Sequence, residues 1–244
     1  MDNELDPSRS EPRWPIHRDV ERYNHLLGID PITIFEEGGL WIEIGPGADA
    51  RPMLPLIGQK DTTLAAIGPH HRSLPAAIHF TQGTVPEDQG FLAAYRGKAR
   101  LVTDVYAAVS YCQDPIQAMI YGSLLLADGG LFLAFTELCR FGDLPTWERI
   151  TEFFRAQLGQ SIGFETMSVL GDASKAYSTC LRVRVQGRST QTASLARIFE
   201  EAAGFIGTPV KTGTLWVAED QSASISRVDY LRAPASSPQR SSQS

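Results

Sequence analysis

A single acidic residue stands next to a short glycine loop in the first quarter of the chain. Glu43 lies inside the apolar run Leu40–Ile44, two residues before Gly45-Pro46-Gly47. Glycines let backbone approach a ligand closely, because they carry no side chain and tolerate a positive φ. A carboxylate in an apolar strand is costly to bury unless it binds something polar. The pattern predicts a strand ending in a loop that holds a nucleotide-like ligand. Glu43 belongs to that site unless nearby backbone N–H groups satisfy it.

The segments that would position this loop alternate between short apolar runs and stretches of helix length. Strands are expected at residues 40–44, 62–67, 77–81, 100–105, 131–136, 164–170, 178–185 and 212–218. Helices are expected at residues 91–95, 115–126, 144–158 and 194–203. Such alternation in the first two thirds is typical of βαβ units. The fold class is therefore expected to be α/β, with a largely parallel sheet.

The sequence indicates one ordered domain between two polar tails. With 244 residues, of which 43% are hydrophobic, the chain can bury one large core. Residues 1–13 and 233–244 carry too little apolar surface to offset the entropy of ordering and are expected to be disordered. Residues 14–232 are expected to form the domain, which begins with a short helix at 17–27.

Charge and cysteine usage limit the partners and the compartment. The formal net charge of −6, without a basic stripe, argues against nucleic acid, because binding to phosphates needs clustered Lys and Arg. No apolar run approaches the roughly 18 residues that span a bilayer, so no membrane contact is expected. The three cysteines include no CxxC pair and are expected to be reduced core thiols, not metal ligands. The acidic start lacks the features of a signal peptide. We expect a cytoplasmic protein without a metal, and its oligomeric state stays open.

Three stretches, in order along the chain, resemble motifs of the class I S-adenosylmethionine-dependent methyltransferases. Glu43–Asp49 is similar to the family's acid-and-glycine loop after the first strand. Ala99–Tyr106 looks like its fourth strand, and Leu124–Leu133 is similar to the glycine turn before its fifth. The resemblance covers roughly residues 40–137. It implies a Rossmann-like three-layer sandwich with a mostly parallel seven-stranded sheet, an antiparallel strand near the C-terminus, and S-adenosyl-L-methionine as cofactor.

The resemblance also implies roles for individual residues. Asp104 and Tyr106, at the mouth of the fourth strand, would be the catalytic residues that position the methyl acceptor. Gly45 and Gly47 would pass under the methionine and ribose of the cofactor, which Glu43 would orient. The implied cofactor-binding residues follow the first four strands: Glu43, Gly45, Pro46, Gly47, Asp49, Gly68, Pro69, Thr84 and Asp104.

Several positions depart from the family's pattern. Gly68 stands where the family carries the acid that holds both ribose hydroxyls, and Thr84 stands near where it often carries an Asp that meets the adenine. Losing a charge-assisted hydrogen bond costs ~1.5–3 kcal/mol, so weaker cofactor binding is expected. Asp49 replaces the family's third glycine. Pro55 predicts that the helix after the loop is short or distorted.

Two functions follow from the resemblance and stay open. The favoured one is a methyltransferase whose acceptor is a small molecule or a protein side chain, with the small molecule preferred. Acceptor contacts are expected from the N-terminal helix around Tyr23 and from residues 110–114. The other is a catalytically inactive methyltransferase fold that serves as a binding or scaffold protein. In that case Asp104 and Tyr106 would only cap their strand and pack against the next helix.

A third function, an NADP-dependent reductase, rests on a different interpretation of the glycine loop. Gly45-x-Gly47-x-x-Ala50 also fits the dinucleotide fingerprint, and the stretch 70–72, His-His-Arg, would hold a 2′-phosphate. Against this function, the acid precedes the loop, and the sequence has no Tyr-x-x-x-Lys pair.

Overall fold

The computed structural model describes residues 26–47, 49–70, 73–137, 141, 144–168, 179–188, 192–216 and 224–232. The strands are β1 (Gly39–Ile44), β2 (Thr62–Gly68), β3 (Ile78–Gln82), β4 (Ala99–Val105), β5 (Leu126–Glu137), β6 (Ser161–Ser168), β7 (Thr179–Gln186), β8 (Thr208–Trp216) and β9 (Ser224–Leu231). The α-helices are α2 (Pro31–Ile34), α3 (Gln89–Tyr95), α4 (Ala108–Tyr111), α5 (Pro115–Leu124), α6 (Leu144–Leu158) and α7 (Leu195–Ile206). A 3-10 helix, η1, spans Arg51–Leu56.

Seven strands form one sheet in the order β3-β2-β1-β4-β5-β7-β6. The first five run parallel, and β7 runs antiparallel to both β5 and β6. This confirms the expected mostly parallel, seven-stranded sheet with an antiparallel strand near the C-terminus. The chain enters at β1 in the middle, builds outward to β3, and then crosses to β4 on the other side of β1. The carboxyl ends of β1 and β4 therefore flank the switch point at which open α/β sheets bind ligands.

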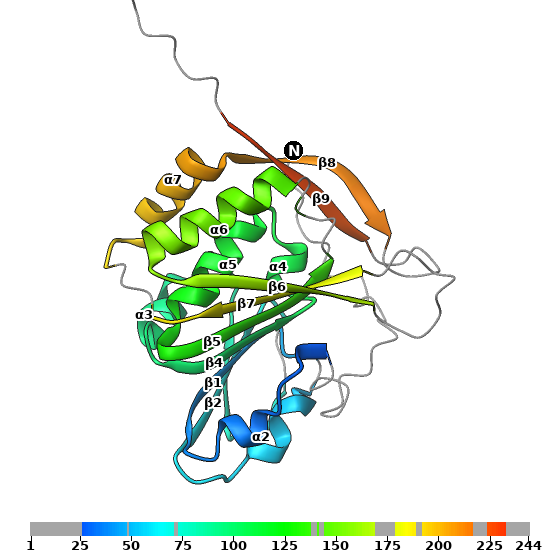
Figure 1. Ribbon diagram of the computed structural model, residues 1–244. Coiled ribbons are helices and arrows are strands. Elements are labelled where there is room, and N and C mark those ends of the chain that lie inside the picture. The colour runs from blue at the N-terminus through cyan, green and yellow to red at the C-terminus, as the bar shows by residue number, and fades with distance from the viewer. Residues whose placement is uncertain are drawn as a thin grey trace, which may run out of the picture.

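The sheet is covered on both faces, but the two layers differ in thickness. On one face, apolar side chains of α3, α5, α6 and α7 pack with the sheet into the larger core. On the other face, the described cover is α2, η1 and the residues next to them, including Leu27, Phe35 and Met53. Figure 1 shows the long helices above the sheet and α2 below it. The expected three-layer sandwich is confirmed, with one layer built from short elements.

The central strand β1 has side chains in both layers. Ile42 and Ile44 belong to the larger core, whereas Trp41 belongs to the smaller one and stacks on Phe35 with ring centroids 6.0 Å apart. A strand buried on both faces needs apolar residues at nearly every position, which explains the continuous run in the sequence. Glu43 is the exception, and the side-chain alternation of a strand puts it on the Trp41 face.

Of the remaining expected elements, α6 is observed with the expected bounds and the others with shifted bounds. The helix expected at 115–126 ends at Leu124, and β5 already begins at Leu126, with its register to β4 shifting across the Asp-Gly-Gly turn. The strand expected at 212–218 is β8, which pairs only with β9 in a separate two-stranded sheet among the described residues. We did not predict β9, because its buried residues do not repeat with a period of two. The period is interrupted where the register of β8 to β9 shifts, between Lys211 and Gly213 of β8.

Some expectations fall on residues outside the described ranges. These include the two tails, most of the N-terminal helix with Tyr23, Cys139, and the stretch 71–72. Of that helix, Leu26 and Leu27 are described, and both are buried in the smaller core. None of the helices within the described ranges combines the length and the hydropathy that crossing a membrane requires.

Candidate functional site

The glycine loop follows β1 at the carboxyl edge of the sheet. Gly45 and Gly47 have φ values of +68° and +71°, a left-handed conformation that favours glycine. The Gly45 N–H donates to the Ile67 carbonyl at 2.8 Å, which ties the loop to the end of β2. On its other side, a Cβ added to Gly45 would lie 2.5 Å from the Ala107 Cβ. The loop therefore lies between the end of β2 and the segment that follows β4, and it has no room for a side chain at position 45.

The other predicted cofactor residues surround this loop at the same edge. Pro46 is buried, and its Cδ lies 3.4 Å from the place where a Cβ on Gly68 would stand. Pro69, after β2, and Thr84, after β3, are both exposed. The Gly83 N–H donates to the Gly68 carbonyl at 2.9 Å, so the two loops run side by side. The structure thus brings the ends of β1, β2 and β3 together as the cofactor prediction requires.

Two features of the loop differ from the pattern that the resemblance implies. Asp49, in place of the third glycine, is exposed and forms an ion pair with Arg51. Instead of a long helix, the six-residue 3-10 helix η1 follows, with Pro55 inside it. The expectation of a short or distorted helix is confirmed, because proline lacks the N–H that an α-helix needs there. Ala50, just before η1, adopts a left-handed conformation with φ +49°.

Glu43 is buried, with 1% of its surface exposed, and it contacts the neighbouring strand. The Thr103 hydroxyl donates to Glu43 Oε2, and Thr103 stands directly opposite Glu43 in the register of β1 and β4. The Trp41 indole N–H donates to the same hydroxyl oxygen at 2.7 Å. Side chains of two strands therefore hold the carboxylate beneath the glycine loop.

Asp104 is fully buried at the end of β4, and its carboxylate accepts backbone hydrogen bonds. Oδ1 accepts from the Ala107 N–H and Oδ2 from the Val109 N–H, both at 3.1 Å. The first donor is the residue before α4 and the second lies in the first turn of α4, so Asp104 fixes the start of this helix. A direct role at the reaction site stays a prediction for this residue.

Tyr106 follows β4 with a strained backbone. Its φ is +47°, a region that residues other than glycine rarely occupy and that costs of order 1–3 kcal/mol. The Tyr106 N–H donates to the Phe135 carbonyl at 2.9 Å, and the two rings meet edge to face at 5.4 Å. Such strain is typical of functional sites, and the ring of Tyr106 is largely buried at the switch point.

The loop at 110–114, expected to contact the acceptor, is anchored at both ends. Buried Ser110 donates to the Thr136 hydroxyl at 2.8 Å, while the Tyr111 side chain is 39% exposed. Asp114 caps α5 by accepting from the Ile116 N–H at 3.0 Å, and the Tyr230 hydroxyl of β9 donates to the same carboxylate at 2.7 Å. Burial, and then the negative charge of Asp114, raise the pKa of Tyr230.

Sequence reasoning missed Trp41 and Thr103, which are both fully buried. The available signal was a polar residue, Thr103, at an inward position of an apolar strand one residue before the predicted Asp104. A single sequence does not say which residue of another strand lies opposite, so the contact between Thr103 and Glu43 could not be predicted. Cys112, expected in the core, is only partly buried, and its thiol donates to the Asp114 carbonyl.

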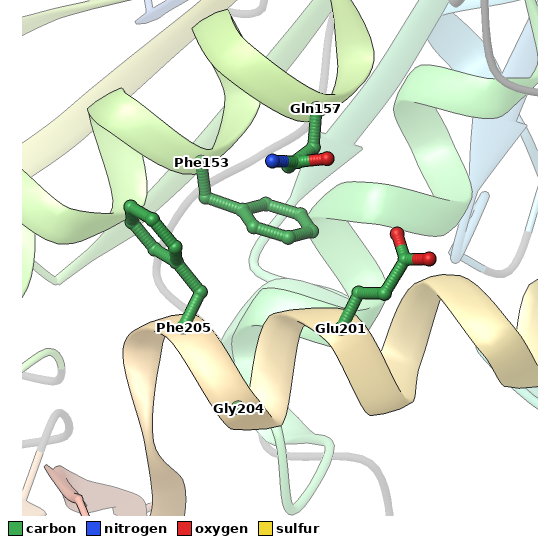
Figure 2. Close-up of a pocket in the computed structure, with 5 residues that line it drawn as sticks. All are labelled: Phe153, Gln157, Glu201, Gly204 and Phe205. Atoms are coloured by element: carbon green, nitrogen blue, oxygen red, sulfur yellow. The ribbon is translucent and has the colours of Figure 1, made fainter.

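One cavity in the described part of the chain lies elsewhere. Its volume is about 280 Å³, and α6 and α7 line it with Phe153, Gln157, Glu201, Gly204 and Phe205. Figure 2 shows the two aromatic rings and the two polar side chains gathered between these helices. The Glu201 carboxylate already pairs with Arg197 at 2.9 Å. None of the predicted site residues lines this cavity.

No protein-family model and no curated protein matches this sequence. A provisionally assigned ribosomal RNA methyltransferase from Plasmodium falciparum is similar over 71% of this chain and 97% of its own, with 11% identity and a TM-score of 0.45. An O-methyltransferase family protein from Burkholderia thailandensis is similar over 70% and 57%, with 12% identity and a TM-score of 0.45. Precorrin 8W decarboxylase from Methanobacterium thermoautotrophicum is similar over 64% and 87%, with 15% identity and a TM-score of 0.41. Values this low carry no argument about activity.

The fold is therefore assigned from the chain itself. Its sheet order reverses beside β1, its only antiparallel strand within that described sheet is β7, and its glycine loop sits at the reversal. The chain therefore has the expected Rossmann-like α/β fold, with a mostly parallel seven-stranded sheet between two layers.

Proposed function

We propose that this chain is an S-adenosylmethionine-dependent methyltransferase that acts on a small-molecule acceptor. The observation that carries the proposal is the placement of the glycine loop. Gly45 and Gly47 adopt positive φ at the switch point of the sheet, directly after a strand that holds the buried carboxylate of Glu43. Ligands of open α/β sheets bind at this point, and the loop has the backbone conformation needed for close approach.

The elements around the loop favour S-adenosylmethionine over a dinucleotide. Dinucleotide sites place a pyrophosphate at the N-terminus of the helix after the first strand, where N–H groups and the helix dipole attract it. Here that helix is the short 3-10 helix η1, which offers little dipole. S-adenosylmethionine carries no phosphate and has a sulfonium cation, so it does not need a helix there. His70 is exposed, while His71 and Arg72 of the proposed 2′-phosphate site lie outside the described residues.

The proposed chemistry is displacement of the methyl group from the sulfonium by an acceptor held at the end of β4. Positioning supplies much of the rate in such a reaction. Tyr106 is the residue we assign to contact with the acceptor, because it lies at the switch point beside Phe135. Asp104 would act by fixing α4 and the loop after it, since both of its carboxylate oxygens accept backbone N–H groups there.

The proposed acceptor is a small molecule rather than a nucleic acid. The net charge of −6, without a basic stripe, disfavours a polyanionic partner, because binding to phosphates needs clustered Lys and Arg. A cytoplasmic location fits a chain with three cysteines and no CxxC pair.

A second candidate is a catalytically inactive binding or scaffold protein. Two observations favour it: Gly68 offers no carboxylate for the ribose, and Gly45 lies so close to Ala107 that the loop and the segment after β4 are in contact. In this case the glycine loop would only connect β1 to η1, and the strain at Tyr106 would serve packing.

Calorimetry with S-adenosylmethionine, S-adenosylhomocysteine and NADPH separates the candidates. The methyltransferase proposal predicts heat with the first two ligands and none with NADPH. Binding of NADPH alone would replace it with the reductase. Absence of heat from all three would leave the scaffold protein.

A further inference from the structure

A chain of two hydrogen bonds connects Trp41, Thr103 and Glu43 beneath the glycine loop. Trp41 and Glu43 are two residues apart on β1, so their side chains share one face, and Thr103 of β4 stands opposite Glu43 in register. The indole nitrogen lies 2.7 Å from the Thr103 hydroxyl oxygen, which in turn donates to Glu43 Oε2. Three side chains from two strands therefore act as one unit.

The donors and acceptors fix the direction of the chain. An indole N–H can only donate, whereas a hydroxyl has one hydrogen to donate and accepts at its lone pairs. Because Trp41 donates to Thr103, the hydroxyl hydrogen remains for an acceptor. The Ile42 carbonyl lies 3.5 Å away, at the limit of a hydrogen bond, and the Glu43 carboxylate is closer. The hydroxyl therefore donates to the Glu43 carboxyl group.

Burial keeps this geometry rigid. Trp41 and Thr103 are fully buried, and Glu43 is 1% exposed, so water does not compete for these groups. Phe35 covers the indole with nearly parallel rings, 14° apart in plane. In surroundings of low dielectric constant, both hydrogen bonds are stronger than in water. The orientation of Glu43 is thus set from β4 and from the thin layer, not only from its own strand.

We propose that Thr103 is a positioning residue for the cofactor site: it holds the Glu43 carboxylate in the orientation that the glycine loop needs to bind S-adenosylmethionine. This inference rests on the proposed function. Trp41 acts through Thr103, because its N–H binds a lone pair of the hydroxyl oxygen and so restricts the rotation of the hydroxyl group. A Thr at this position therefore belongs to the site although it touches no ligand.

The alternative is that this unit only stabilises the core. A purely structural Thr103 would change the free energy of unfolding and leave the affinity of the folded protein unchanged. A positioning Thr103 would change the affinity as well, and serine, which keeps the hydroxyl, would restore it. Ser123→Ala is the matched control, because Ser123 is also a fully buried hydroxyl, donating to the Ile120 carbonyl at 2.8 Å within α5.

The test is calorimetry with S-adenosylhomocysteine at a temperature at which each variant is folded. Thr103→Val is expected to weaken binding by about tenfold to a hundredfold, since it removes a hydrogen bond that holds a buried polar group in place. Thr103→Ser is expected to bind within about threefold of the wild type, and Ser123→Ala to bind as the wild type does. Should Thr103→Val fail to fold, Trp41→Phe takes its place. This variant is expected to lose at least about threefold in affinity for S-adenosylhomocysteine, because the Thr103–Glu43 hydrogen bond is partly retained.

The outcomes separate this inference from the proposed function. Binding by the wild type with unchanged affinity in Thr103→Val, or in Trp41→Phe where that variant replaces it, overturns the inference alone. Equal losses in Thr103→Val and Ser123→Ala also overturn it, because the effect would then be general core damage. No binding by the wild type overturns the proposed function and the inference with it.

Discussion

Glu43 and Asp104 stand one register position apart on adjacent strands, yet their carboxylates serve opposite faces of the sheet. Glu43 pairs with Thr103, and Ile44 pairs with Asp104. Because side chains alternate along a strand, Glu43 lies on the face of η1 and Asp104 on the face of α4. Asp104 accepts from the first turn of α4, while Glu43 is bound to Thr103. The two acids flank the glycine loop from different sides and have separate roles.

Gly45→Ala is expected to abolish binding of S-adenosylhomocysteine. The added Cβ would meet the Ala107 Cβ at 2.5 Å, and φ is +68°, so the loop must move. Gly58→Ala is the matched control, because Gly58 has a φ of +82° but no atom within 4 Å of an added Cβ. It shares the backbone strain without the clash. Calorimetry on both variants, with circular dichroism to establish folding, checks this prediction. Unchanged affinity in Gly45→Ala would show that the loop is not the binding element.

Gly68→Asp is expected to strengthen cofactor binding. A Cβ at position 68 would lie 3.4 Å from the Pro46 Cδ and 3.9 Å from the Phe80 ring, ordinary contact distances. The new carboxylate would reach the ribose hydroxyls at the end of β2, and such a charge-assisted bond contributes ~1.5–3 kcal/mol, or about tenfold or more in affinity. Gly68→Asn supplies the same shape without the charge. Equal affinities of the two variants for S-adenosylhomocysteine would argue against a ribose beside Gly68.

Asp104→Ala is expected to destabilise the protein by about 2 kcal/mol or more. It removes the acceptor of two backbone N–H groups at a fully buried position, where unsatisfied donors cost ~1–3 kcal/mol each. Asp30→Ala is the control, because Asp30 caps α2 by accepting from the Ile32 N–H at 3.0 Å at an exposed position. For Asp30→Ala, the free energy of unfolding should fall by about 0.5–1 kcal/mol. Urea unfolding measures both, and equal losses would contradict the buried cap.

Stability is expected to fall at alkaline pH. Burial raises the pKa of Tyr230 above its ordinary value of 10.0, and burial likewise raises that of Tyr121. The folded protein therefore keeps both phenols neutral, while the unfolded chain loses their protons above about pH 10. The contribution of the two neutral phenols to the free energy of unfolding is fully present below about pH 10, and it is lost as the pH rises through their pKa values in the folded protein.

Replacing both tyrosines by phenylalanine tests this pH dependence. The double variant should lose stability at neutral pH, because the hydrogen bonds to Asp114 and to the Asp88 carbonyl disappear. Its stability should then decline less steeply than that of the wild type above pH 10. Urea midpoints measured across this range check the slope, and parallel curves for the two proteins would contradict the assignment.

The long periodic elements could be predicted from the sequence, and the short ones could not. The helix expected at 144–158 is observed as α6 with the same bounds, because its apolar stripe repeats over four turns. The first four strands are observed within two residues of their expected bounds. In contrast, α2 and η1 are four and six residues long, too short to show a period. Of the thin layer that covers Glu43, the shortened helix after the glycine loop was expected from Pro55, whereas α2 was not.

Relations between strands account for the rest of the difference at the site. The sequence indicates that Glu43 is an unusual buried acid and that Asp104 ends a strand. It does not contain the register of β1 and β4, which places Thr103 opposite Glu43 and sends Asp104 to the other face. Nor was α4 predicted, because a four-residue helix is too short to show a period in the sequence. The binding of its first residues by Asp104 could therefore not be predicted either.

Chemical-shift mapping with S-adenosylhomocysteine tests the central claim, that the cofactor binds at the glycine loop, most directly. In a titration of ¹⁵N-labelled protein, the amide signals of Gly45 and Gly47 should move most, together with those after β2 and β4. Gly204, in the cavity between α6 and α7, serves as the internal reference and should stay unchanged. Shifts that centre on Gly204, or no shifts at saturating ligand, would contradict the account.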